Sequence, residues 1–190
     1  MTRALYAAGW GYVALCGLVL AQPRTTPTPA PHLRAAPFRG EAAEWFAAMK
    51  PYCNAVEVEV QQQHRPAPAG VEGAGYGAAC FALAGKIERA RATIEGLSSG
   101  DRAAAAGIVF AVGHPVADAG DDESAGPIMR LVVEYQPQNY MALYHAGISE
   151  DILGHADLAR THLERFLAIY TAEDGWRANA KAVLARLDGR

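Results

Sequence analysis

The residues best suited to chemistry lie in one short acidic stretch of the chain. It contains His114, Asp118, Asp121, Asp122 and Glu123. Histidine together with aspartate can bind zinc, and a loop rich in carboxylate oxygens can bind calcium. The spacing matches no EF-hand loop, because the glycine and the distal glutamate are misplaced. We favour a structural interpretation, in which Asp121 or Asp122 caps a helix and Glu123 lies near the positive end of its dipole.

Three further histidines, His145, His155 and His162, fall within one predicted helical unit. We place His155 in a turn and His162 on the helix that follows it. Seven residues of helix span about 10 Å, which is too far for a shared metal ion without other ligands. The sequence therefore predicts no metal site and no cofactor.

Two of the three cysteines lie in the body of the chain. The repeat phase described below places Cys53 at the start of one helix and Cys80 in the later half of its neighbour. The two residues either form a disulfide, which an exported compartment permits, or remain buried thiols. No nucleophile signature surrounds them, and the chain has no serine elbow, phosphate-binding loop or catalytic carboxylate motif. We therefore predict that the protein is not an enzyme.

The bulk composition describes one ordinary domain with an apolar leader. The chain has 190 residues, a net charge of −3 and a hydrophobic content of 51%. A length of this order supports a sizeable core, and the absence of a basic stripe argues against nucleic acid as a partner.

The N-terminus carries an uncharged apolar run from Ala4 to Ala21, between Arg3 and Arg24. It is long enough for a transmembrane anchor, and it also has the form of a cleavable signal peptide. Both alternatives export the body of the protein. We divide the chain into this segment (1–22), a proline-rich spacer (23–37) and a helical domain (38–190).

Glycines and alanines recur along the helical domain at a fixed period. Gly85, Gly120 and Gly154 are 34 or 35 residues apart. The same spacing separates four alanines, Ala55, Ala90, Ala125 and Ala159. A period near 34 residues is typical of stacked helical hairpins, because one hairpin cannot bury its apolar face alone.

The last unit shows the pattern most clearly. We expect helices over residues 140–153 and 158–170, a turn at Gly154 and a closing helix over 176–187. The unit resembles a tetratricopeptide repeat through Leu143, Gly147, Gly154, Ala159, Leu163 and Phe166. It departs from that pattern at Glu150, where a large apolar residue is common.

Three earlier units match less well. Residues 71–97 match through Ala78, Phe81, Gly85, Ala90, Ile94 and Leu97. The next unit keeps phase but is interrupted by Pro115 and Pro127. The first unit spans residues 38–63, and its turn glycine is replaced by Lys50 and Pro51. We predict that the short stretch from Val56 to Val60 in this unit is helical.

The resemblance implies an all-α, right-handed solenoid of stacked hairpins, with an irregular helical bundle as the alternative fold. In the tetratricopeptide family the first helix of each unit lines a concave surface. Carried over to this chain, the partner-binding positions are Phe110, His114, Met141, Tyr144, Ile148 and Asp151.

These features predict an exported scaffold that binds another protein. It would be tethered to the inner membrane on the periplasmic side and would help to assemble or stabilise a membrane complex. The alternative is a soluble periplasmic module that binds a peptide or small ligand after signal cleavage.

Overall fold

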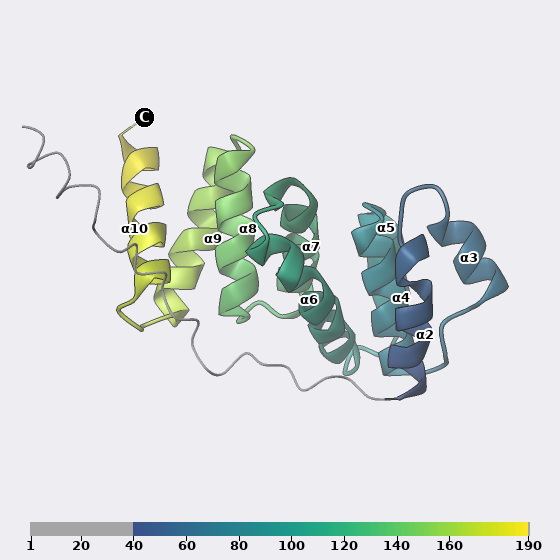
Figure 1. Cartoon of the computed structure of the whole chain (residues 1–190). Coiled ribbons are helices and arrows are strands. Elements are labelled where there is room, and N and C mark those ends of the chain that lie inside the picture. Colours follow the sequence, from purple (N-terminus) through teal and green to yellow (C-terminus); the bar gives the residue numbers. More distant parts are fainter. Residues whose placement is uncertain (1–39, 190) are drawn as a thin grey trace, which may run out of the picture. The chain divides into compact units, whose positions relative to one another are not determined.

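The computed structural model describes residues 40–189, in which every regular element is a helix and no strand occurs (Figure 1). The predicted all-α class is confirmed for this range. The elements are α2 (Glu41–Met49), the short 3₁₀ helix η2 (Lys50–Tyr52), α3 (Val58–His64), α4 (Val71–Leu83), α5 (Ile87–Glu95), α6 (Arg102–Asp118), α7 (Asp122–Tyr135), α8 (Tyr140–Ile152), α9 (Ala156–Ile169) and α10 (Gly175–Asp188).

The predicted leader (1–22) and spacer (23–37) lie outside the described residues. Between residues 40 and 189, no helix has both the length and the apolar character needed to cross a membrane.

Three consecutive helix pairs, α4–α5, α6–α7 and α8–α9, each turn at a glycine with positive φ. The φ angles of Gly85, Gly120 and Gly154 are +72°, +81° and +81°. At each turn the residue after the glycine donates its backbone N–H to the carbonyl five positions earlier, which forms a Schellman cap. The period of the glycines therefore marks the end of the first helix in each pair.

The last pair confirms the predicted boundaries closely. Helix α8 ends at Ile152 and α10 spans Gly175–Asp188, while α9 begins at Ala156, two residues earlier than expected. Leu143, Leu163 and Phe166 are fully buried around the crossing of α8 with α9.

The pairs pack on one another in chain order. Helix α4 contacts α6, α7 lies against α8, and α10 lies against both α8 and α9 (Figure 1). Pro115 and Pro127 do not interrupt this order, because α6 and α7 continue through them. Each proline lacks the N–H that would donate to the carbonyl four residues earlier, so each helix continues with one backbone hydrogen bond fewer.

The first unit differs from the prediction. Cys53 does not start a helix: it follows η2, and α3 begins only at Val58. The side chain of Asn54 accepts hydrogen bonds from the backbone N–H groups of Val56 and Glu57, which forms a turn before the helix. Helices α2 and α3 each pack against α4.

A disulfide joins Cys53 to Cys80. It ties the loop after η2 to the later half of α4, so the alternative of two free thiols does not apply. The bond closes a loop with a sequence separation of 27 residues.

We expect reduction of this disulfide to lower the free energy of unfolding by about 3–4 kcal/mol, because the reduced unfolded chain gains loop entropy. Urea unfolding followed by circular dichroism, with and without reductant, measures the change. Peptide mapping after alkylation in denaturant should leave Cys53 and Cys80 unlabelled unless reductant is added. Labelling of both without reductant would contradict the bond.

A second prediction concerns the crossing of α8 with α9. A Cβ atom on Gly147 would lie 2.6 Å from Cγ of buried Leu163, so Gly147→Ala should lower the free energy of unfolding by about 1–3 kcal/mol. Gly77→Ala is the matched control, because the nearest atom to its Cβ is 3.4 Å away. Alanine favours helix over glycine by about 1 kcal/mol, so the control should unfold no more easily than wild type. Equal losses in both variants would contradict the packing argument.

Candidate functional site

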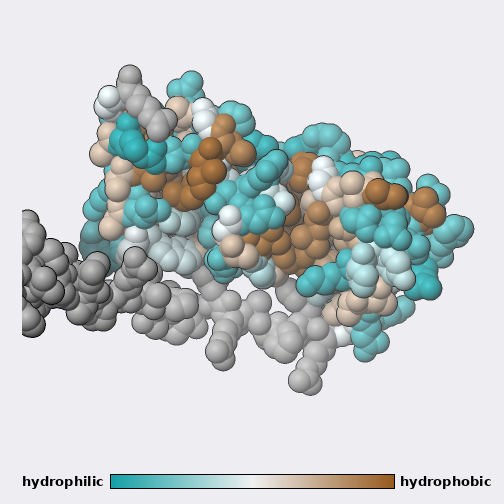
Figure 2. Space-filling view, turned by 45° about the horizontal axis from the view of Figure 1, so that its top comes forward, coloured by the Kyte–Doolittle hydropathy of each residue, from teal (hydrophilic) through white to brown (hydrophobic). Residues whose placement is uncertain are grey.

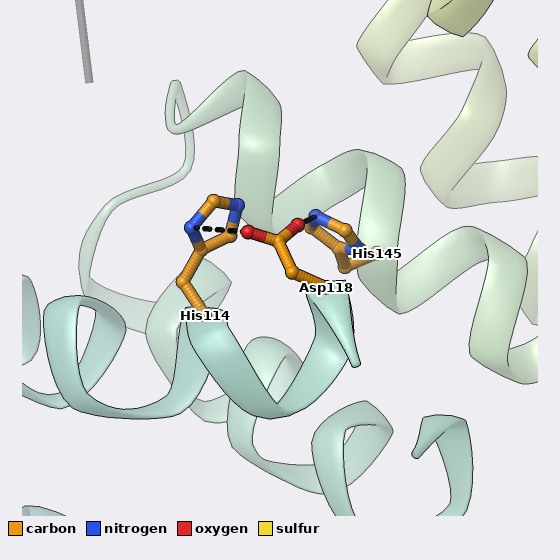
Figure 3. Close-up of side chains that lie close together, drawn as sticks. All are labelled: His114, Asp118 and His145. Carbon is orange, nitrogen blue, oxygen red and sulfur yellow. Dashed lines mark ion pairs between the residues drawn. The ribbon is translucent and has the colours of Figure 1, made fainter. Parts of the chain in front are cut away.

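The structure brings two histidines and an aspartate together where α6 faces α8. His114 and Asp118 lie one turn apart near the end of α6, and His145 comes from α8 (Figure 3). The Asp118 carboxylate lies between the two imidazoles. Its Oδ2 is 3.6 Å from Nδ1 of His114, and its Oδ1 is 3.6 Å from Nε2 of His145. One ligand atom from each residue lies within 4.8 Å of the others.

Local structure fixes the placement of these side chains. Residues i and i+4 share one face of a helix, so His114 and Asp118 point the same way from α6. Next to His114, Gly113 lets α7 approach closely: a Cβ there would lie 2.6 Å from Cγ2 of Ile128. Asn139 caps α8 by accepting the backbone N–H of Ala142, which sets where that helix begins.

The two histidines each have a buried ring nitrogen that lacks a hydrogen-bond partner in the described part of the chain. His145 is only 7% exposed, and Nε2 of both His114 and His145 is buried with no hydrogen-bond partner among residues 40–189. The 3.6 Å separations from Asp118 are longer than a hydrogen bond. A buried polar group left unpaired costs about 1–3 kcal/mol, so the arrangement is unfavourable unless something else contacts these nitrogens.

The protein environment favours neutral imidazoles. Burial, together with a smaller contribution from nearby His114, lowers the pKa of His145 to about 4, while Asp118 opposes the shift. Burial also lowers the pKa of His114, again against the attraction of Asp118. At neutral pH both rings therefore keep nitrogen lone pairs. Two neutral imidazoles and a carboxylate are a donor set that transition metals bind.

Aromatic rings surround the three residues. Phe110 lies against His114 with ring centroids 4.9 Å apart, and Tyr144 meets the edge of His145 at 5.3 Å. Trp176 of α10 lies 6.0 Å from His145 and stacks on Tyr144 at 5.3 Å. The row of rings runs from α6 across α8 to α10 and limits the movement of both histidines.

The predicted partner-binding residues are placed in different surroundings. Phe110 and His114 form part of the cluster on α6, and Ile148 is partly buried against the core. Met141 is 1% exposed and therefore belongs to the core. Partner binding by these positions stays a prediction.

Helix α10 engages Tyr144 and Asp151, the two remaining predicted contacts. Asn179 donates a hydrogen bond to the Tyr144 hydroxyl at 2.8 Å. Arg186 donates to both carboxylate oxygens of Asp151, at 3.0 and 2.6 Å. The closing helix thus contacts the surface that the sequence assigns to a partner.

The predicted capping role of the acidic stretch is confirmed at one residue. Asp121 accepts the backbone N–H of Ser124 at the start of α7. Asp122 instead accepts a hydrogen bond from the Ser149 hydroxyl of α8.

Sequence reasoning weighed His114 with Asp118 but did not connect them to His145. The repeat period offered a hint that His145 lies near His114. A shift of 34 residues places Ile148 at the position equivalent to His114, and His145 lies about one helical turn before Ile148. Only the packing of α6 on α8 shows that this offset brings the side chains together.

A second buried group accounts for the departure from the tetratricopeptide pattern at Glu150. Its carboxylate is almost completely buried, accepts a hydrogen bond from Arg130 of α7, and lies 2.5 Å from Nδ1 of His155. Within residues 40–189, His114, Asp118 and His145 are the one set of three close enough to share a metal ion.

No protein-family model, characterised protein or solved structure matches this chain. Any function of the chain must therefore be inferred from its own residues and their geometry.

The low pKa of His145 predicts that acid destabilises the domain. Between about pH 6.5 and pH 4 the unfolded chain protonates this histidine while the folded chain does not, so unfolding takes up a proton and stability falls as the pH falls. The loss should approach about 3 kcal/mol at pH 4. Urea unfolding at several pH values should show a shallower loss in His145→Gln than in wild type.

His64→Gln is the matched control, because His64 is exposed at the end of α3. It should keep the wild-type pH dependence. Identical profiles for wild type and His145→Gln would contradict the burial argument.

Proposed function

We propose that the protein is an exported scaffold of tetratricopeptide-like helix pairs that binds another protein. The observation that carries this proposal is the sequence of three glycine-closed helix pairs packed in chain order and followed by a closing helix. Stacked hairpins of this kind present an extended surface that repeat proteins use to bind partners.

Export is supported by two independent features. The Cys53–Cys80 disulfide is typical of an oxidising compartment such as the periplasm. The apolar run from Ala4 to Ala21 has the composition of an anchor or a signal peptide. Retention of the run would tether the scaffold to the inner membrane, where it would contact a membrane complex.

A surface suited to a protein partner lies at the turn between α8 and α9. Ile152, Leu153 and Leu158 are all exposed there. Figure 2 shows hydrophobic side chains interspersed with hydrophilic ones on one face of the domain. Large apolar side chains clustered on a surface mark interaction sites more often than isolated ones do.

This turn offers a cleaner probe than Tyr144. Replacing Tyr144 would remove its ring contacts with Trp176 and Phe166 and its hydrogen bond from Asn179, so it would loosen α10 as well as alter the surface. Ile152 and Leu158 are exposed, so serine at both positions should leave the core intact.

We expect the double variant Ile152→Ser, Leu158→Ser to lose its protein partner because the apolar contact area is gone. The measurement is co-purification of the tagged full-length protein from native membranes in mild detergent, with mass spectrometry of the retained proteins. A reproducible stoichiometric set should accompany wild type and be depleted from the double variant.

The matched control is Val56→Ser, Val60→Ser, which changes two exposed apolar residues on and before α3. It should retain the partner set. Equal capture by all three proteins would exclude the α8–α9 turn as the contact. A soluble, shortened wild-type protein with no partner would contradict the anchored scaffold and favour the soluble ligand-binding module.

A further inference from the structure

The cluster on α6 and α8 contains polar atoms that the scaffold proposal does not use. His145 is more than nine-tenths buried, and its Nε2 faces Asp118 without a hydrogen-bond partner in the described part of the chain. Nε2 of His114 is likewise buried and unpaired there. Two unsatisfied imidazoles beside one carboxylate indicate that a ligand is missing from their shared space.

We propose that His114, Asp118 and His145 bind one divalent transition-metal ion of the zinc class. An ion bonded at about 2.0–2.1 Å in tetrahedral geometry holds its ligand atoms about 3.3 Å apart. The two nitrogen–oxygen separations across the cluster are 3.6 Å, and one ligand atom from each of the three residues lies within 4.8 Å of the others. The side chains must therefore move inward by rotamer adjustment to bind one ion.

The donor set selects the class of ion. Magnesium and calcium take oxygen ligands, whereas two imidazoles with one carboxylate suit zinc, cobalt, nickel or ferrous iron. These metals bind the neutral imidazole, which is the form that burial favours here.

The position of Asp118 gives the ion a route to the site. Its side chain is 53% exposed at the end of α6, while the two histidines lie further inside. Three protein ligands leave at least one coordination position open to water or to a ligand from outside. The bound ion would also join α6 to α8 and thereby link two successive helix pairs.

The test is zinc binding to the untagged full-length protein in mild detergent after treatment with a chelator. A histidine tag is avoided because it would bind zinc itself. Isothermal titration with Zn²⁺ should give one site per chain. Asp118→Asn should weaken that site about tenfold or more, and His114→Gln should do the same, because each removes one of three ligands.

Two control variants test whether the loss is specific. Glu123→Gln removes an exposed carboxylate near the start of α7, and His64→Gln removes an exposed histidine far along the chain. Both should bind Zn²⁺ as wild type does. Mg²⁺ in excess should not displace the zinc.

Cobalt gives a second readout that a purely structural role would not produce. Co²⁺ bound by two nitrogens and a carboxylate should show visible absorption bands, which Asp118→Asn should lose while keeping the wild-type circular dichroism. The proposal is overturned if wild type binds no Zn²⁺ or if Asp118→Asn and His114→Gln bind it as tightly as wild type. These outcomes do not bear on partner capture, so the metal site and the scaffold function can fail separately.

Discussion

Neighbouring helices approach one another so closely that glycine is required at several crossings. A Cβ atom on Gly75, Gly113 or Gly147 would lie 2.6–2.7 Å from a side-chain carbon of the facing helix. These contacts set α4 against α6, α6 against α7, and α8 against α9. Because the cluster residues His114 and His145 sit one and two positions from such glycines, their placement follows from the same close packing.

Side chains of α8 contact both the histidine cluster and the closing helix α10. The row of rings from Phe110 to Trp176 packs the histidine cluster on one side and the closing helix on the other. Asn179 and Arg186 of α10 then take up the polar groups of Tyr144 and Asp151. The surface that the sequence assigns to a partner is therefore already contacted by α10, whereas apolar side chains at the turn between α8 and α9 are exposed.

Glu150 shows how the chain departs from a regular repeat without losing the packing of α7, α8 and α9. A buried carboxylate is costly unless it is paired, and here Arg130 of α7 and His155, in the turn before α9, supply hydrogen-bonding groups. An apolar residue at this position would need no such partners. With glutamate at this position, the contact of α8 with α7 and with the turn before α9 depends on Arg130 and His155.

Features that depend on local interactions could be predicted from the amino-acid sequence. The glycine period predicted the ends of α4, α6 and α8, because a left-handed cap is a property of a few consecutive residues. For the same reason Asp121 or Asp122 was expected to cap a helix, and Asp121 does so. The boundaries of the last pair and of α10 followed from the same periodic pattern. The folded chain was needed to show that Cys53 pairs with Cys80 from outside a helix, that α10 engages Tyr144, and that His145 joins His114 and Asp118. Each of these contacts joins residues far apart in the chain, and their meeting depends on the offsets at which whole helices pack.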